Sequence, residues 1–160
     1  MRSIIFILFA ATVILSSCGQ KNSVTANYEL KTECMGVELD GSQTVKAWGN
    51  GRNRFDAVDQ AKKNAINDVI FKGIREGKAQ CETRPLVGEV NAREKHQQFF
   101  NAFFVDKGEY EKFISVKDER IGEKIVRDRS KGRESVTHGF IIRIDVPGLR
   151  SRLTEAGIIK

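Results

Sequence analysis

Cysteine and histidine are the residues of this chain whose side chains could do nucleophilic or metal chemistry. His96 and His138 lie far apart in the sequence, and no two cysteines form a C-x-x-C pair. The ligand spacing of a zinc site is therefore missing, and we expect no metal and no other cofactor. Ser135 lies close to His138, but a strand would turn these two side chains to opposite faces. We therefore predict a protein that is not an enzyme.

The first residues have the anatomy of a secretory signal, with Arg2 ahead of an apolar run from Ile4 to Leu15. A permanent membrane helix needs about 20 apolar residues, so a cleaved signal peptide is the better interpretation. The sequence Leu15-Ser16-Ser17-Cys18 then resembles the lipobox of bacterial lipoproteins: a branched apolar residue, two small residues and cysteine. The resemblance implies cleavage before Cys18 and attachment of lipid to its thiol.

The lipobox resemblance divides the chain into three parts. Residues 1–17 would be the signal peptide, 18–27 a flexible linker behind the lipidated Cys18, and 28–160 a single domain. The acyl chains would hold the domain on membrane lipid essentially permanently. Asp directly after the cysteine is an inner-membrane retention signal in some bacteria, and an acidic linker directs export to the surface in others. This chain has neither, so we expect the periplasmic face of the outer membrane.

Cys34 and Cys81 remain as an even pair of cysteines in an oxidising compartment, which predicts a disulfide. Closing a loop of this size would stabilise the domain by roughly 4 kcal/mol in the chain-entropy model. Two buried unpaired thiols are the alternative, because the sequence alone gives no geometry.

Residue patterning predicts an α+β domain. Alternating apolar residues indicate strands at 28–34, 43–49, 115–127 and 136–146, and helical periodicity indicates helices at 54–76, 91–105 and from Pro147. Asp40-Gly41 marks the first hairpin turn, and Asn53 is placed to cap the first helix. We expect a four-stranded antiparallel sheet, made of two hairpins, with helices packed on one face.

The expected helix at 91–105 carries four phenylalanines in two adjacent columns: Phe99, Phe100, Phe103 and Phe104. The simpler interpretation is that these rings fill the core, and the alternative is a wide apolar face offered to a partner. His138 falls on the apolar face of the last strand, where a core histidine is expected more often than a ligand.

Ala47-Trp48-Gly49-Asn50-Gly51, followed by Ala57, Ala61 and Ala65, is similar to two kinds of small envelope module. These are the 20-kilodalton Lpp-type lipoprotein family and the amino-terminal domain of flagellar assembly protein T, in which an apolar strand ends in a glycine pair and leads into an alanine-rich helix. The similarity covers about 44–74, with a weaker echo at 140–158 and no counterpart for 91–114. It implies a structural or accessory part of an envelope machine.

Charge favours anionic neighbours in the envelope. Lys and Arg number 27 against 21 Asp and Glu, but they are interspersed with acids, so we expect no nucleic-acid partner. The leading hypothesis is a non-catalytic interaction or accessory subunit of an envelope assembly or secretion complex, with an envelope protein as partner. The alternative is a module that binds an anionic polymer, lipopolysaccharide or cell wall, through the expected hairpin tip with Arg127, Arg129, Lys131 and Arg133.

Overall fold

A computed structural model gives the fold and describes residues 31–115, 126–128 and 135–160. The predicted signal peptide, the lipidation site Cys18 and the linker lie outside the described residues. The same holds for three of the four cations of the predicted anion site: Arg129, Lys131 and Arg133.

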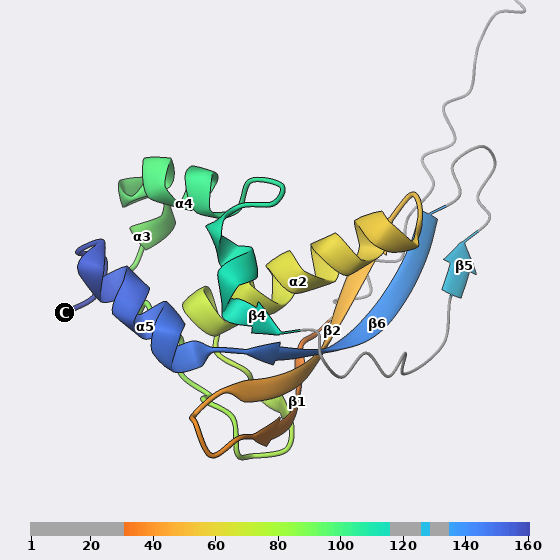
Figure 1. The fold of residues 1–160 in the computed structure, drawn as a ribbon, viewed down its shortest axis with the longest axis horizontal. Helices are drawn as coiled ribbons and strands as arrows, with labels where there is room; N and C mark the ends of the chain where they lie inside the picture. Colours follow the sequence, from red (N-terminus) through yellow and green to blue (C-terminus); the bar gives the residue numbers. More distant parts are fainter. Residues whose placement is uncertain (1–30, 116–125, 129–134) are drawn as a thin grey trace, which may run out of the picture.

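One mixed sheet forms the centre of the domain (Figure 1). Its described strands are β1 (Glu33–Val37), β2 (Gln43–Gly51), β3 (Glu76–Gly77), β4 (Ile114–Ser115), β5 (Val126–Asp128) and β6 (Ser135–Ile144). The order across the sheet is β3-β1-β2-β6, and both β4 and β5 pair with β6. Antiparallel pairing of β2 with β6 runs without a break from Gln43↔Ile144 to Gly51↔Val136. These two long strands form the centre of the sheet.

The α+β class is confirmed, but the expected sheet of four antiparallel strands is wrong in detail. β3 adds a parallel partner to β1, and the described residues at the two ends of the expected third strand form β4 and β5. A strand of two residues leaves no alternation to detect. Backbone contacts place β3 instead. Gly77 takes a φ of 88° and lies against Cys34, and the Lys78 amide donates to the Cys34 carbonyl at 2.9 Å.

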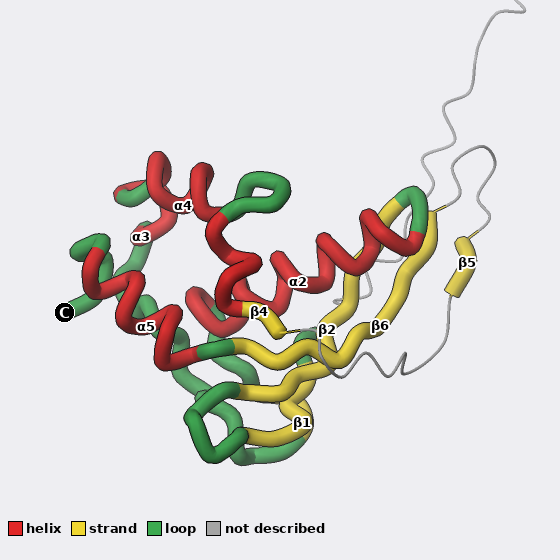
Figure 2. Tube along the Cα trace, in the orientation of Figure 1, coloured by secondary structure: helices red, strands yellow, loops and turns green. Residues whose placement is uncertain are grey.

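The helices are shorter than the periodicity predicts. The structure contains α2 (Arg54–Phe71), α3 (Ala92–Lys95), α4 (Gln97–Phe103), the 3₁₀ helix η2 (Glu109–Phe113) and α5 (Val146–Glu155), shown in red in Figure 2. α2 ends early because Gly73 takes a φ of 75° and donates its N–H to the Asp68 carbonyl at 2.7 Å. The expected aromatic helix is divided at His96, whose backbone leaves the helical region.

α2 packs on one face of the sheet and builds the core. The alternation of β2 and β6 is as predicted, with Val45, Ala47, Phe140, Ile142 and Ile144 turned inward. Ala57, Ala61 and Ala65 of α2 are completely buried. The helix comes so close that a Cβ added at Gly49 would lie 1.9 Å from the Ala57 carbonyl oxygen, so this position accepts only glycine.

Two linkages fix the beginning of the described chain to the domain. The predicted disulfide is present: Cys34 in β1 is bonded to Cys81, with 5.8 Å between their Cα atoms. Just before it, the buried Thr32 hydroxyl donates to the Asp68 carboxylate of α2 at 2.5 Å. Asp68 also pairs with Lys72 at 3.0 Å, so its charge is balanced within the helix.

We predict that Gly49→Ala destabilises the domain by about 3 kcal/mol or more, because the added methyl group forces α2 away from β2. Urea unfolding followed by circular dichroism measures the change. Gly88→Ala is the matched control, since a Cβ there meets no atom within 4 Å and it should change stability by no more than about 0.5 kcal/mol. Equal stability of the two variants would contradict the close contact of α2 with β2.

Candidate interaction surfaces

The four phenylalanines of the predicted partner face are divided between core and surface. Phe100 and Phe103 are fully buried, and Phe99 and Phe104 are half-buried against the same core. Phe100 packs edge-on against Phe71 at the end of α2, with ring centroids 4.9 Å apart. The cluster therefore serves mainly to fill the core, and only the outer edges of Phe99 and Phe104 are exposed to a partner.

Cations cover the exposed edges of these rings. The Arg152 guanidinium lies 5.1 Å from the Phe99 ring and donates two hydrogen bonds to Glu109, at 2.9 and 3.1 Å. This bidentate pair lowers the pKa of Glu109 and joins α5 to η2. Arg93 lies 5.7 Å from both Phe71 and Phe104. The aromatic cluster is thus capped by charge and offers little free apolar area.

A hydrogen-bonded network joins α2 to the segment that follows the aromatic cluster. The buried Tyr110 hydroxyl donates to Asp59 at 2.8 Å, and burial together with this carboxylate raises the pKa of Tyr110 far above its usual value. Lys63 pairs with Asp59 at 3.5 Å and with Asp106. Burial alone would lower the pKa of Lys63, but these two carboxylates raise it overall. Each charge here has a partner, which is typical of a structural network.

His138 lies in the core, as its place on the apolar face of β6 predicts. Its side chain is 8% exposed, and its ring lies 5.7 Å from that of Phe140. Burial lowers the pKa of His138, and the nearby positive charge of Arg54 lowers it further. The folded protein therefore holds this histidine in its neutral form.

A cationic hollow of about 850 Å³ lies at the beginning of α2. The close-packed Gly49 and Gly51 bring the chain into the turn before α2, and the Asn53 side chain caps the helix by accepting the Asp56 amide at 3.0 Å. Nine charged residues line the hollow: Arg52, Arg54, Asp56, Asp59, Lys62, Lys63, Asp106, Lys107 and Glu111.

Ion pairs leave a surplus of positive charge in this hollow. Arg52 pairs with Asp56 at 3.1 Å, and Lys63 is held by its two carboxylates. Within the described part of the chain, Arg54, Lys62, Lys107 and Glu111 form no such pair, so the five cations of the hollow exceed its four acids by one. Phe55 projects beside them with 84% of its surface exposed. This combination of free cations and an exposed ring suits an anionic partner.

The opposite face of the sheet from α2 presents an aromatic surface. Trp48 lies across from Gly139 in the β2–β6 register, and a Cβ at Gly139 would come within 3.1–3.2 Å of the indole ring. The ammonium group of Lys46 lies 4.9 Å from that ring. Trp48 and its neighbour Ile141 are half-buried, so part of each side chain is exposed. We call Lys46, Trp48 and Ile141 the tryptophan face.

The predicted anion site is only partly placed. Arg127 lies within β5, where its backbone pairs with Val136, so it belongs to a strand rather than to the predicted turn. The other three cations lie outside the described residues. Figure 1 shows β5 and the beginning of α2 at the same end of β6, which agrees with the pairing of Gly51 and Val136.

The chain matches no protein-family model, no curated protein and no solved structure. The similarity to the Lpp-type family and to flagellar assembly protein T therefore stays a prediction. Among the residues that the structure describes, no helix is both long and apolar enough to cross a membrane. The described residues also contain no group of three or more His, Cys, Asp or Glu side chains that could hold a metal ion.

Sequence reasoning missed the cationic hollow and the tryptophan face. Arg52 and Arg54 are too few to form a charge run, and Phe55 occupies a position in a helix where an aromatic residue usually indicates core. The alternation of β2 does place Trp48 on the outer face, and that pattern could have identified it as a contact residue.

We predict that His138 makes the domain less stable as the pH falls below about 6.5. Its pKa is lowered in the folded state, so the unfolded state binds more protons in this window and stability rises with pH there. His138→Gln should flatten the profile between pH 7.5 and 5.0 in urea unfolding. A wild-type profile in His138→Gln would refute this assignment.

Proposed function

We propose that this chain is a lipid-anchored, non-catalytic interaction module of the bacterial envelope, an accessory subunit of an assembly or secretion complex. The observation that carries the proposal is the sequence Leu15-Ser16-Ser17-Cys18 behind a short apolar run. Acyl chains on Cys18 would anchor the protein in the outer membrane, facing the periplasm. The proposed partner is an envelope protein.

Several polar side chains support the non-catalytic part of this proposal, because they hold the helices together. Tyr110, Asp59 and Lys63 join α2 to η2, and Arg152 with Glu109 joins α5 to η2. His138 is buried beside Phe140. Side chains locked in this way are not open to a substrate, whereas the exposed surfaces carry rings and cations suited to binding.

The tryptophan face is the surface that we propose for the envelope protein. Tryptophan is among the residues that contribute most to binding energy at protein interfaces. Trp48 is already oriented, because its ring rests on Gly139 and under the Lys46 ammonium group. Little side-chain entropy is then lost on binding.

An anionic envelope polymer remains the second candidate partner. The observation that favours it is the hollow at the beginning of α2, where five cations face four acids and Arg54, Lys62 and Lys107 form no ion pair with a described residue. A polymer rich in phosphate or carboxylate groups would complement this charge, and salt would weaken its binding.

We predict that Cys18→Ala abolishes incorporation of labelled fatty acid and releases the protein from the membrane fraction. Only the Cys18 thiol lies in the lipobox, so Cys34→Ala/Cys81→Ala is the control and should still be labelled. Metabolic labelling with palmitate, followed by fractionation, checks both points. Labelling that persists in Cys18→Ala would disprove the proposed anchor.

We predict that Trp48→Ala reduces a specific protein crosslink by about 30-fold, the loss expected at an interface hot spot. The measurement is chemical crosslinking in native membranes, purification of the lipidated protein and quantitative mass spectrometry. Leu39→Ala, which removes an exposed apolar side chain outside the tryptophan face, is the matched control and should keep the crosslink. Unchanged crosslinking in Trp48→Ala would argue against this face. Recovery of polysaccharide alone would favour the polymer candidate.

A further inference from the structure

Two large apolar side chains project from opposite ends of β2. Phe55 lies just beyond the end of the strand, in the first turn of α2, and is 84% exposed, whereas Leu39 lies in the β1–β2 hairpin turn and is fully exposed. The nine residues of β2 separate these ends by roughly 27 Å. Isolated exposed apolar residues are common and need no partner. We therefore compare the charged residues beside Phe55 with those beside Leu39.

The charges around these two side chains are opposite. Phe55 follows Arg52 and Arg54 and precedes Asp56, which pairs with Arg52 at 3.1 Å, so one net positive charge remains beside the ring. Leu39 stands between Glu38 and Asp40.

One net negative charge remains beside Leu39, because a single cation, Arg143, accompanies the two acids. Two hydrogen bonds from Ser42 lower the pKa of Asp40, and Glu38 lies 3.4 Å from Arg143. An anionic surface would therefore attract the Phe55 end of the domain and repel the Leu39 end.

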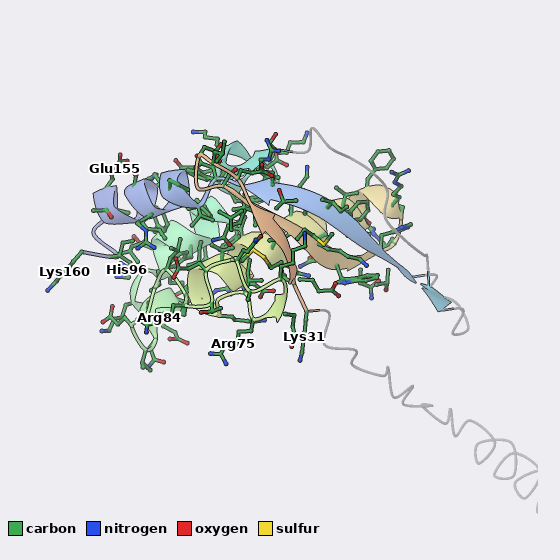
Figure 3. All side chains as sticks on the ribbon, turned by 90° about the horizontal axis from the view of Figure 1, so that it is seen from below. Lys31, Arg75, Arg84, His96, Glu155 and Lys160 are labelled. Carbon is green, nitrogen blue, oxygen red and sulfur yellow. A yellow bond between two sulfur atoms is a disulfide. The ribbon has the colours of Figure 1, made fainter. Side chains whose placement is uncertain are left out.

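The length of chain before the described domain is compatible with such a contact. Lys31, labelled in Figure 3, follows Cys18 by 13 residues, which span at most about 45 Å. β1 pairs with β2 at Glu33↔Lys46, near the middle of the sheet, so the chain enters the domain about half a strand length from either end. A domain held by this linker would stay within reach of the bilayer.

We propose that Arg52, Arg54 and Phe55, which we call the cationic turn, form a docking surface for anionic phospholipid. The Phe55 ring enters the boundary between headgroups and acyl chains, and the two guanidinium groups bind lipid phosphates. An exposed ring favours a lipid surface over a soluble polymer, because a polymer offers no apolar layer to bury it. The inference rests on the proposed lipid anchor, which keeps the domain beside the membrane.

A fluorescence experiment on the lipidated protein tests this docking. Trp48 is the single tryptophan of the chain, so Trp48→Phe gives a silent background into which Phe55→Trp or Leu39→Trp places one probe. Each protein is reconstituted in vesicles of phosphatidylethanolamine and phosphatidylglycerol, or of phosphatidylcholine alone, containing brominated lipid as a quencher. We expect quenching and a blue shift for the probe at position 55 in anionic vesicles only, and neither change for the probe at position 39.

Charge variants separate docking from anchoring. Arg52→Gln/Arg54→Gln should lower the ratio of docked to undocked domain by about 30-fold, since each cation near an anionic surface contributes a roughly fivefold factor. Arg75→Gln/Arg84→Gln is the charge-matched control. These exposed arginines, labelled in Figure 3, lie beyond the C-terminal end of α2, and their loss should leave the quenching unchanged.

The two proposals fail in different ways. Protein that floats with the vesicles but shows no quenching at position 55, or equal quenching at positions 39 and 55, overturns the docking and leaves the anchor intact. Quenching at position 55 that is equal in phosphatidylcholine vesicles also overturns it, because the charge would then play no part. Protein that does not float carries no anchor, and this outcome removes the basis of both proposals.

Discussion

The close approach of α2 to β2 is the constraint on which the rest of this structure depends. At Gly49 the backbone of the strand and that of the helix leave no room for a single methyl group, and the alanines facing it are completely buried. The contact is made by backbone atoms, so no change of side-chain rotamer can relieve a larger residue there. This fit fixes the depth at which α2 lies on the sheet and therefore the positions of the residues at both helix ends.

Each end of α2 carries a different part of the architecture. At its beginning, the turn after Gly51 projects Arg52, Arg54 and Phe55 from the domain. Towards its end, Asp68 accepts a hydrogen bond from Thr32, and Phe71 packs against Phe100 of the aromatic cluster. Between these ends, Asp59 and Lys63 of α2 bind Tyr110 and Asp106, and His138 is buried beside Phe140.

The sequence predicts the long elements well and the short ones poorly. Ten residues of alternation define β6, and Asn53 marks the start of α2, so both are found at the expected places. β3 has two residues and depends on the backbone of Gly77, which no hydropathy pattern reveals. Cys34 and Cys81 could be paired because they are the two cysteines that remain after the lipobox. The exposure of Phe55, in contrast, depends on how α2 meets the sheet.

The disulfide also determines how the domain responds to mechanical load. A pulling force on the chain ahead of Lys31 acts first on β1, which pairs with β2 in antiparallel orientation. The hydrogen bonds between β1 and β2 would then break one after another. The rupture would stop at Cys34, the second residue of β1, because the force then passes through the covalent bond to Cys81. A load applied ahead of Lys31 would therefore reach the loop around Cys81 through a covalent bond and bypass the rest of β1.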